Sequence, residues 1–391
     1  MAQKCSLPVR EPIPGTNLVP EDVLPKEVSM ERMQKLALQA FFYDYSICTV
    51  TQSMSGGFLG GLEAMVRKYL AKRIQAHYAS DSEPFAIAIL LGLYQIIVAN
   101  ASSPGHHTAH AKGAAAILQI ENNPLYLIQA SLTSHPLLLD GNQSCHSTTG
   151  KYSTDRQMYE FLIRLDPIWK RTEDLLAGSP FAVDSDVLLL LKIEAVKLND
   201  DISLWQKSQN EEIKAVTIDS GPPPNLTHGV GYWPGRVDMY IDLYVATLWN
   251  VSRIVRCLLI TLITRLSGIL CDGVNHDADR LEVSNLVEDM LASIPYHLSE
   301  DLQVFLRERH EHTEITNPGR SVGGLLLMHP IYLAAYLDII PSDRRLYFKK
   351  CLVWIAQRMG VGQAAFLAQA PQVDNQYFAG GCLIVLAGLL L

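Results

Sequence analysis

Apolar residues recur at intervals of three and four along most of the 391-residue chain, and runs that alternate between apolar and polar are nearly absent. The first spacing places apolar side chains on one face of a helix, whereas alternation is typical of strands. Helices are therefore predicted over residues 30–50, 58–78, 84–100, 104–120, 155–176, 185–209, 237–270, 277–293, 322–337, 342–370 and 375–390, with another beginning near Pro124. We expect an all-α protein, a large bundle of long antiparallel helices in a single compact unit.

The ends and the polar segments of the chain suggest its organisation. Residues 1–29 hold five prolines and no clear period, so we expect an extended lead-in before an all-helical unit over 30–391. Polar segments near 135–153 and 217–235 predict variable surface loops. The last apolar stretch, 379–391, is shorter than the roughly 18 residues that a membrane span needs. We therefore expect a terminal helix packed into the core and no contact with a membrane.

Composition narrows the classes of function. Hydrophobic residues make up 48% of the chain and charged residues 18%, as expected of a globular protein with a large core. The net charge is −8, which argues against nucleic-acid binding as the main activity because phosphate contacts need clustered Lys and Arg. The densest basic groups, within 67–73 and 344–350, have helical spacing and are interpreted as solvated helix faces. No direct contact with nucleic acid is expected.

The seven cysteines are scattered through the sequence, and the nearest pair is Cys257 and Cys271. This spacing excludes CxxC-type zinc sites and redox pairs, and it predicts reduced, buried thiols. The opening "MAQKCSLPVREPIPG" has no apolar core, so no signal peptide is expected. The predicted compartment is the nucleus or the cytoplasm.

Four segments together resemble the fungal-specific regulatory domain of binuclear zinc-cluster transcription factors. They are "FFYDYSICTVTQSMSGGFLGGLEAMV", "AIAILLGLYQIIVANASSPGHHTAHAKGAAAILQI", "DLYVATLWNVSRIVRCLLI" and "SVGGLLLMHPIYLAAYLDIIPSDRRLYFKKCLVWIAQRMGVGQA". They occur in the order and at the separations typical of that family, from about residue 36 to the end. The resemblance implies an all-helical regulatory domain over 30–391.

The sequence departs from that family at its start. Members usually begin with six cysteines that bind two zinc ions and contact DNA, whereas here Cys5 stands alone before Cys48. The resemblance therefore implies the regulatory half of such a factor without the module that contacts DNA. A protein that naturally lacks this module is favoured over a sequence from which the module was left out. Such a protein would act through a partner protein, possibly a full-length zinc-cluster factor, or through a small effector.

The segment "PGHHTAHAKGAAAILQI" raises the question of a metal site. His106 and His110 would share a helix face, and two imidazoles at that spacing can hold zinc. No nearby residue supplies a third ligand, so no metal and no cofactor are expected. His110 matches the family motif, whose small residues let helices approach closely. Its role is interpreted as packing and hydrogen bonding, with contact to a ligand as the alternative.

A second polar group lies inside an apolar helix, in "LWNVSRIVR". Trp249, Asn250 and Arg253 fall within two turns, and a buried arginine is expected to pair with a carboxylate or to bind an anion. An internal ion pair that fixes helix packing is favoured, and a role in anchoring a ligand is the alternative. Tyr94 belongs to a helix that would line a cavity with aromatic residues near Tyr43, although such aromatic stripes are usually core. No catalytic residue is identified.

Two hypotheses for function follow. The favoured one is a regulatory protein without its own DNA-binding module, linked to a metabolic or secondary-metabolite gene set. The alternative is a helical scaffold that binds a small apolar metabolite or catalyses a cofactor-independent cyclisation or isomerisation of it. No G-x-S-x-G, HExxH or Cys-His nucleophile arrangement points to an enzyme.

Overall fold

The chain was examined in a computed structural model. It describes residues 40–41, 43–45, 83–100, 151–177, 184–219, 229–309, 314–374, 377–378, 380–382 and 385. The chain separates into two units, Met1–Phe41 and Phe42–Leu391, and every helix and strand named here belongs to the second. The predicted helices over 58–78 and 104–120, the one near Pro124, and the predicted loop up to residue 150 lie outside the described residues.

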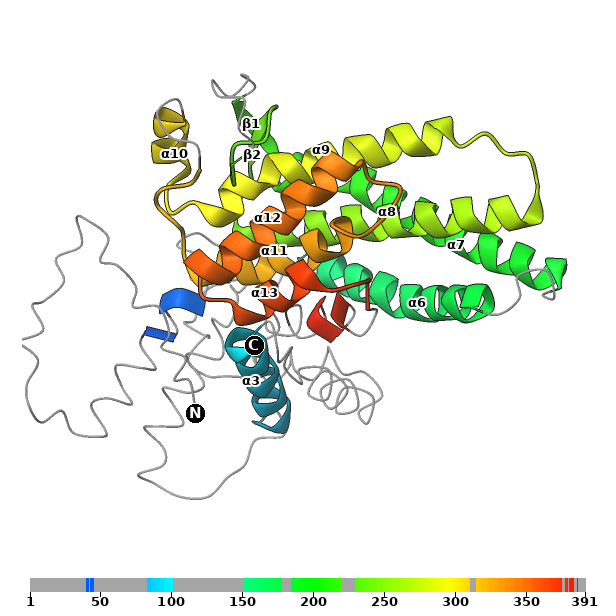
Figure 1. Cartoon of the computed structure of the whole chain (residues 1–391), viewed down its shortest axis with the longest axis horizontal. Coiled ribbons are helices and arrows are strands. Elements are labelled where there is room, and N and C mark those ends of the chain that lie inside the picture. The colour runs from blue at the N-terminus through cyan, green and yellow to red at the C-terminus, as the bar shows by residue number, and fades with distance from the viewer. Residues whose placement is uncertain are drawn as a thin grey trace, which may run out of the picture. The chain divides into compact units, whose positions relative to one another are not determined.

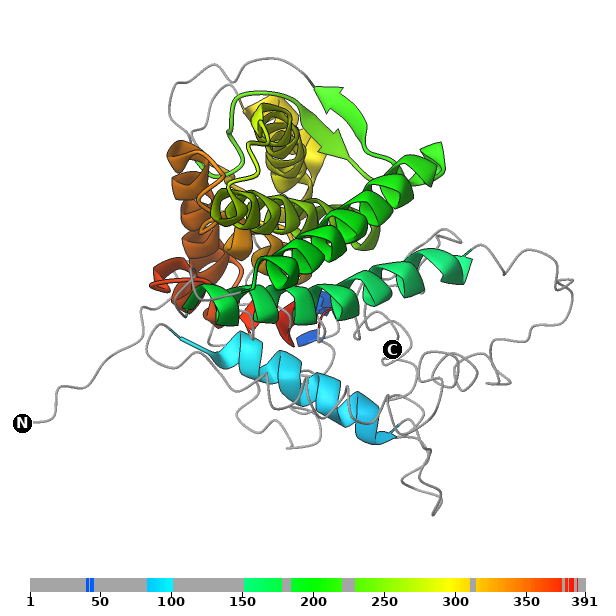
Figure 2. The ribbon, with the colours of Figure 1, turned by 90° about the vertical axis from the view of Figure 1, so that its right-hand side faces the viewer.

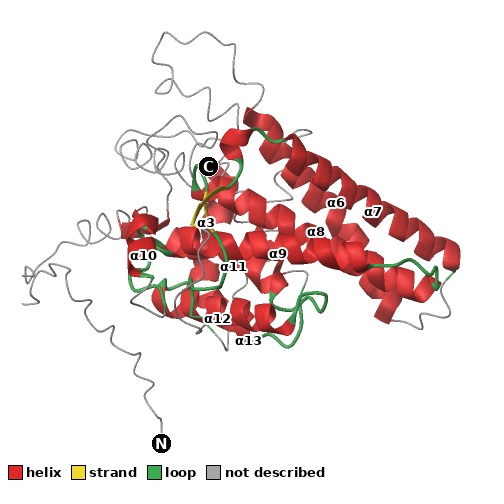
Figure 3. Ribbon diagram, turned by 90° about the horizontal axis from the view of Figure 1, so that it is seen from above, coloured by secondary structure: helices red, strands yellow, loops and turns green. Residues whose placement is uncertain are grey.

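Helices dominate the described part of the chain (Figures 1 and 3), which confirms the predicted all-α class. They are α3 (Glu83–Val98), α6 (Lys151–Ala177), α7 (Ser185–Ser208), α8 (Leu243–Leu270), α9 (Asp277–Leu298), α10 (Leu302–Glu308), α11 (Ser321–Ala334), α12 (Ser342–Arg358) and α13 (Gly362–Gln369). A short 3₁₀ turn spans Glu211–Ile213, and the strands β1 (Val216–Asp219) and β2 (Val237–Met239) pair antiparallel.

Helix α8 lies at the centre of the described bundle. The Asp242 side chain caps its first turn by accepting a hydrogen bond from the backbone N–H of Val245 at 2.8 Å. Of its 28 residues, 21 are buried. A helix that is apolar on nearly all sides has to be covered on all sides, and α8 contacts α6, α7, α9 and α11.

Helix α7 packs along α8 through one face only. Its N-terminus is capped by Asp184, whose carboxylate accepts from the backbone N–H of Asp186 at 2.9 Å. Its inward side chains follow helical spacing and are Leu188, Leu191, Ala195, Leu198, Ile202 and Trp205. Helix α6 lies beside α7 (Figure 2). Exposed ion pairs such as Arg164–Asp201, at 2.7 Å, join the two helices.

Helices α9 and α11 approach each other very closely at one glycine. A Cβ placed on Gly323 would lie 1.9 Å from the backbone carbonyl oxygen of His297. Only a residue without a side chain allows the two backbones to meet there. This contact holds α11 against the C-terminal end of α9.

Several predicted boundaries are wrong, among them the start of α6, which lies at Lys151 inside the segment predicted as the loop 135–153. The helix predicted from residue 237 begins at Leu243, because residues 237–239 form β2 instead. The helix predicted over 342–370 is two helices, since Gly360 adopts φ +73°, a conformation that ends a helix and that side chains disfavour. Helix α10 was not predicted, and β1 extends into the segment predicted as the loop 217–235.

The C-terminal stretch agrees with its prediction where it is described. Residues 377–378, 380–382 and 385 are helical, and Cys382 and Val385 are buried. Among the described helices, none is long and apolar enough to cross a bilayer.

Candidate functional site

The predicted polar group of α8 meets polar residues of α9 in the core. The Asn250 side-chain amide donates to Ser293 Oγ at 2.9 Å and lies 3.2 Å from His297 Nε2. Ser293 Oγ in turn donates to the backbone carbonyl of Met290 at 2.7 Å. All these side chains are buried, so α8 and α9 are joined by hydrogen bonds inside an apolar interface.

Arg253 is buried and has several partners. Its Nη1 donates to the Tyr240 hydroxyl at 2.7 Å and to Asn250 Oδ1 at 3.1 Å. Its Nε lies 3.5 Å from the Asp289 carboxylate, and its guanidinium lies over the Trp249 ring at 5.4 Å. The expected carboxylate partner of Arg253 is therefore Asp289 of α9.

A second arginine extends this cluster to the small sheet. Arg236 pairs with Asp289 and also with Asp238, at 3.0 Å. The buried Asp238 carboxylate accepts from the Thr217 hydroxyl of β1 at 2.8 Å. With Arg253, the cluster balances two guanidinium groups against two carboxylates, which is the pairing that buried charges require.

Histidine 297 is neutral in this cluster. Burial lowers its pKa from the ordinary value of 6.5 to about 3, because the charged form loses its solvation. The ring is thus a hydrogen-bond partner for Asn250 and carries no charge near pH 7. The cluster pairs its own charges and joins α8 to α9 by hydrogen bonds, so it fits the interpretation that this polar group fixes helix packing.

The other predicted residues that the structure describes do not share the hydrogen bonds of this cluster. Trp249 donates its ring N–H to the backbone carbonyl of Ile213 at 2.7 Å, and Tyr94, on α3, is 57% exposed. His110 lies outside the described residues. A ligand contact for any of these residues, or for Asn250 and Arg253, stays a prediction.

Sequence analysis missed the partners on α9. Asp289, Ser293 and His297 follow one another at intervals of four along α9. Residues four apart share a helix face, so this spacing was a signal that polar side chains line one face of α9.

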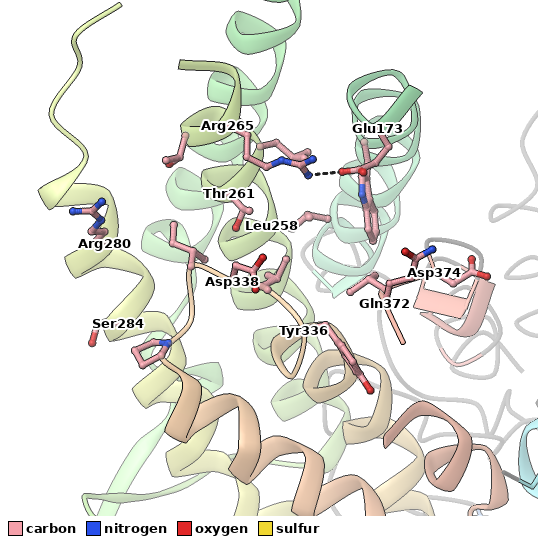
Figure 4. Close-up of a pocket in the computed structure, with 17 residues that line it drawn as sticks. Glu173, Leu258, Thr261, Arg265, Arg280, Ser284, Tyr336, Asp338, Gln372 and Asp374 are labelled. Carbon is pink, nitrogen blue, oxygen red and sulfur yellow. Dashed lines mark hydrogen bonds and ion pairs between the residues drawn. The ribbon is translucent and has the colours of Figure 1, made fainter. Parts of the chain in front are cut away.

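A pocket of about 1090 Å³ opens at the other end of α8 (Figure 4). It is formed by α6, α8, α9, the segment between α11 and α12, and the segment after α13. Its lining residues are Trp169, Glu173, Leu258, Thr261, Leu262, Thr264, Arg265, Arg280, Ser284, Tyr336, Leu337, Asp338, Ile339, Pro341, Gln372, Val373 and Asp374. Neither Arg253 nor its neighbours belong to this lining.

The charged groups of the pocket pair mostly with each other or with nearby residues. Arg265 of α8 forms an ion pair with Glu173 of α6 at 2.6 Å, drawn as a dashed line in Figure 4. Asp338 pairs with Arg345 at 2.9 Å. These polar groups lie around apolar side chains such as Leu262. Nine of the seventeen lining residues are polar or charged, so the pocket suits a molecule that combines apolar surface with several polar groups.

Two tyrosines of the α11 region hold the pocket wall in place. The Tyr332 hydroxyl donates to the Gln372 carbonyl at 3.3 Å and accepts from the backbone N–H of Asp374 at 2.8 Å. The Tyr336 hydroxyl donates to the Leu367 carbonyl at 2.9 Å. Burial raises the pKa of both phenols, so they remain neutral donors near pH 7.

The described residues show no group of three or more His, Cys, Asp and Glu arranged to hold a metal ion. Burial raises the pKa of the Cys257 thiol to about 12. It therefore stays protonated and is a poor nucleophile.

Comparison with known proteins identifies the family. The chain is 41% identical to "Transcription factor dbaG" of Emericella nidulans over 420 aligned positions, which cover 95% of this chain and all of that protein. The chain belongs to the family of the transcription factor dbaG. This membership confirms the resemblance to a fungal transcription factor, while the zinc-cluster regulatory domain and its missing DNA-binding module stay predictions. No family model and no solved structure matches the chain.

Proposed function

We propose that this protein regulates transcription in the nucleus through a partner protein and does not contact DNA itself. The observation that carries the proposal is the 41% identity with a transcription factor along that protein's whole length. The partner is a protein that does bind DNA, such as a full-length zinc-cluster factor.

The charge distribution supports action through a partner. The chain has 40 acidic against 32 basic residues, and its seven cysteines are too scattered for a six-cysteine zinc cluster. The basic group on α12 also has local contacts. Arg344 donates to Glu288 at 2.6 Å, and the Lys349 ammonium lies 4.1 Å from the centre of the Tyr336 ring. Side chains held in this way are less available to phosphates.

The pocket beside α8 suggests what the regulator responds to. Its volume of about 1090 Å³ lies just above the usual range for ligand sites, about 300–1,000 Å³, and its lining combines apolar side chains with polar and charged ones. We propose that a small metabolite with both apolar surface and polar groups binds there and links the regulator to a metabolic gene set.

The same pocket favours a second candidate function. A cavity that holds an apolar molecule by shape can also promote a cyclisation or isomerisation that depends on orientation. In that case the helical scaffold is a metabolite-binding protein or enzyme of secondary metabolism, and the loss of the protein would first change metabolites and not transcripts.

A gene deletion combined with chromatin immunoprecipitation tests the main proposal. We expect transcripts of a defined gene set to change and the tagged protein to be found at their promoters. We also expect the purified chain alone to show no sequence-specific binding to those promoters in fluorescence anisotropy. Specific binding by the chain alone overturns the partner requirement. Unchanged transcripts with an accumulating precursor would instead support the enzyme.

A pocket-filling variant tests the effector. Thr264 lines the pocket, so Thr264→Trp should occupy it, whereas Leu281→Trp places the same side chain on an exposed position outside the lining. We expect binding of the apolar dye Nile red, followed by fluorescence, to be lost in T264W and kept in L281W. Equal binding by both variants contradicts a ligand site at this pocket.

A further inference from the structure

The outward face of α7 carries an apolar stripe that the described helices leave exposed. Its members are Leu189, Leu190, Ile193, Val196 and Leu204, with exposed fractions between 37% and 68%. They recur at intervals of three and four, the spacing of one helix face. Figure 2 shows α7 at the front of the bundle. An exposed apolar stripe of this kind indicates a surface that binds another protein surface of matching shape and charge.

The same face of α7 carries charges of opposite sign at its two ends. Asp186 lies in the first turn of α7 and Lys207 in the last, and both are exposed. Within the part of the chain that the structure describes, neither residue forms an ion pair. By contrast, charged residues on the flanks of α7, such as Glu194 and Asp201, pair with α6.

The apolar and charged residues on this face of α7 are complementary to those of a second α7 that runs antiparallel to it. In one register of the antiparallel pair, residue i of one copy faces residue 393 − i of the other. Leu189 then lies opposite Leu204, and Asp186 lies opposite Lys207. The two-fold axis repeats each of these contacts. A parallel arrangement would instead put Asp186 opposite Asp186. The antiparallel arrangement also aligns the two helix dipoles favourably.

The centre of this arrangement is compatible with close packing. Val196 lies opposite Lys197, whose aliphatic stem can cover it while the ammonium stays in solvent. Asp200 lies opposite Ile193 and one turn from Lys197 of the other copy. The one acidic residue inside the stripe therefore has a cation of the second copy within reach.

We propose that two copies of this chain associate through the outward faces of α7 in an antiparallel pair. One helix of 24 residues is about 36 Å long. A contact limited to one helix per copy falls at or below the small end of specific interfaces, near 1,200 Å² in total, so the pair should dissociate at about micromolar concentrations. This inference does not depend on the proposed function.

Sedimentation equilibrium of the full chain tests the pairing. We expect the mass to rise from one to two copies over concentrations of about 1–100 µM. Ile193→Lys should keep the protein monomeric, whereas Leu281→Lys, at an exposed apolar position on α9, should leave the pairing unchanged. The proposal is overturned if the wild type stays monomeric throughout this range or if I193K still forms dimers. It is also overturned if the chain is monomeric and its α7 face binds another protein instead.

Charge exchange tests the antiparallel direction and does not depend on I193K folding. Asp186→Lys and Lys207→Asp should each weaken self-association at least tenfold, because they oppose like charges. An equimolar mixture of D186K and K207D should restore pairing, since every contact then joins opposite charges. Circular dichroism confirms that each variant is folded. If the mixture pairs no better than the single variants, the antiparallel arrangement is wrong.

Discussion

Arg253 is the residue whose environment best explains the polar group of α8. A guanidinium without partners in the core would cost several kcal/mol. Arg253 instead donates to Tyr240 and Asn250 and lies beside Asp289. Each partner comes from a different part of the chain, so this one side chain ties the end of the small sheet to α8 and α9.

Replacing Arg253 should therefore destabilise the fold. Arg253→Ala removes the donor to the Tyr240 hydroxyl and one of the two donors to Asn250 Oδ1, and we expect a loss of about 2–4 kcal/mol in the free energy of unfolding. Urea denaturation measures it. Arg280→Ala is the matched control, because its side chain is 70% exposed and its pair with Asp277 is worth about 1 kcal/mol or less. Equal losses in both variants would contradict a structural role for the cluster.

The neutral state of His297 predicts how stability depends on pH. Its pKa is about 3 in the folded protein and near the ordinary 6.5 when unfolded. Between these values the unfolded state binds a proton that the folded state does not. Stability is therefore fully present above pH 6.5 and falls as the pH is lowered, by up to about 1.4 kcal/mol per pH unit from this group.

The variant His297→Gln separates this contribution from those of other groups. Glutamine retains an acceptor for Asn250 but does not titrate. Between pH 6.5 and 4.5, urea denaturation should give a smaller slope of stability against pH for H297Q than for the wild type. Identical slopes would show that His297 is not buried in its neutral form.

At the scale of helices, the crossing of α9 and α11 depends on one missing side chain. Gly323→Ala would place a methyl group 1.9 Å from the His297 carbonyl oxygen, so the backbones have to separate. We expect a loss of about 2 kcal/mol or more. Gly268→Ala, in α8, has open space and should stabilise by about 0.5–1 kcal/mol. Thermal unfolding compares the two, and a neutral G323A would contradict the close crossing.

The elements were predictable to different degrees. In α7 and α8 the apolar residues recur at helical spacing, and this pattern outweighs the local helix propensities. Both helices were therefore predicted from the sequence. The break between α12 and α13 was not, because Gly360 sits in a pattern whose apolar period continues across it. The hairpin of β1 and β2 was also missed, since three or four residues are too few to show alternation.

At the scale of the molecule, the candidate sites were less predictable than the helices. The sequence indicated that Asn250 and Arg253 need partners, but the partners lie on α9 and near the sheet, at distances along the chain that no local pattern encodes. The pocket is harder still. Its walls come from five separate segments, and only the packing of the whole chain brings Glu173 to Arg265.

The distribution of thiols gives a test of this packing. Of the cysteines that the structure describes, Cys271 is exposed, whereas Cys257, Cys351 and Cys382 are buried with raised pKa values. We expect iodoacetamide at pH 8 to modify Cys271 in the native protein and the other three only after unfolding, as peptide mass mapping would reveal. Rapid native modification of Cys351 would contradict the packing of α12.

The burial of α8 limits how this regulator can be dissected. Its backbone amides should exchange with solvent only when the whole bundle opens, since four other helices cover it. A truncation from the N-terminal side through α7 removes α6 and α7, and one from the C-terminal side back to α8 removes α9 and α11. Serial truncation, the common route for assigning activities to parts of a regulator, should therefore yield unfolded fragments, and point variants on the surface are the way to separate one contact from another.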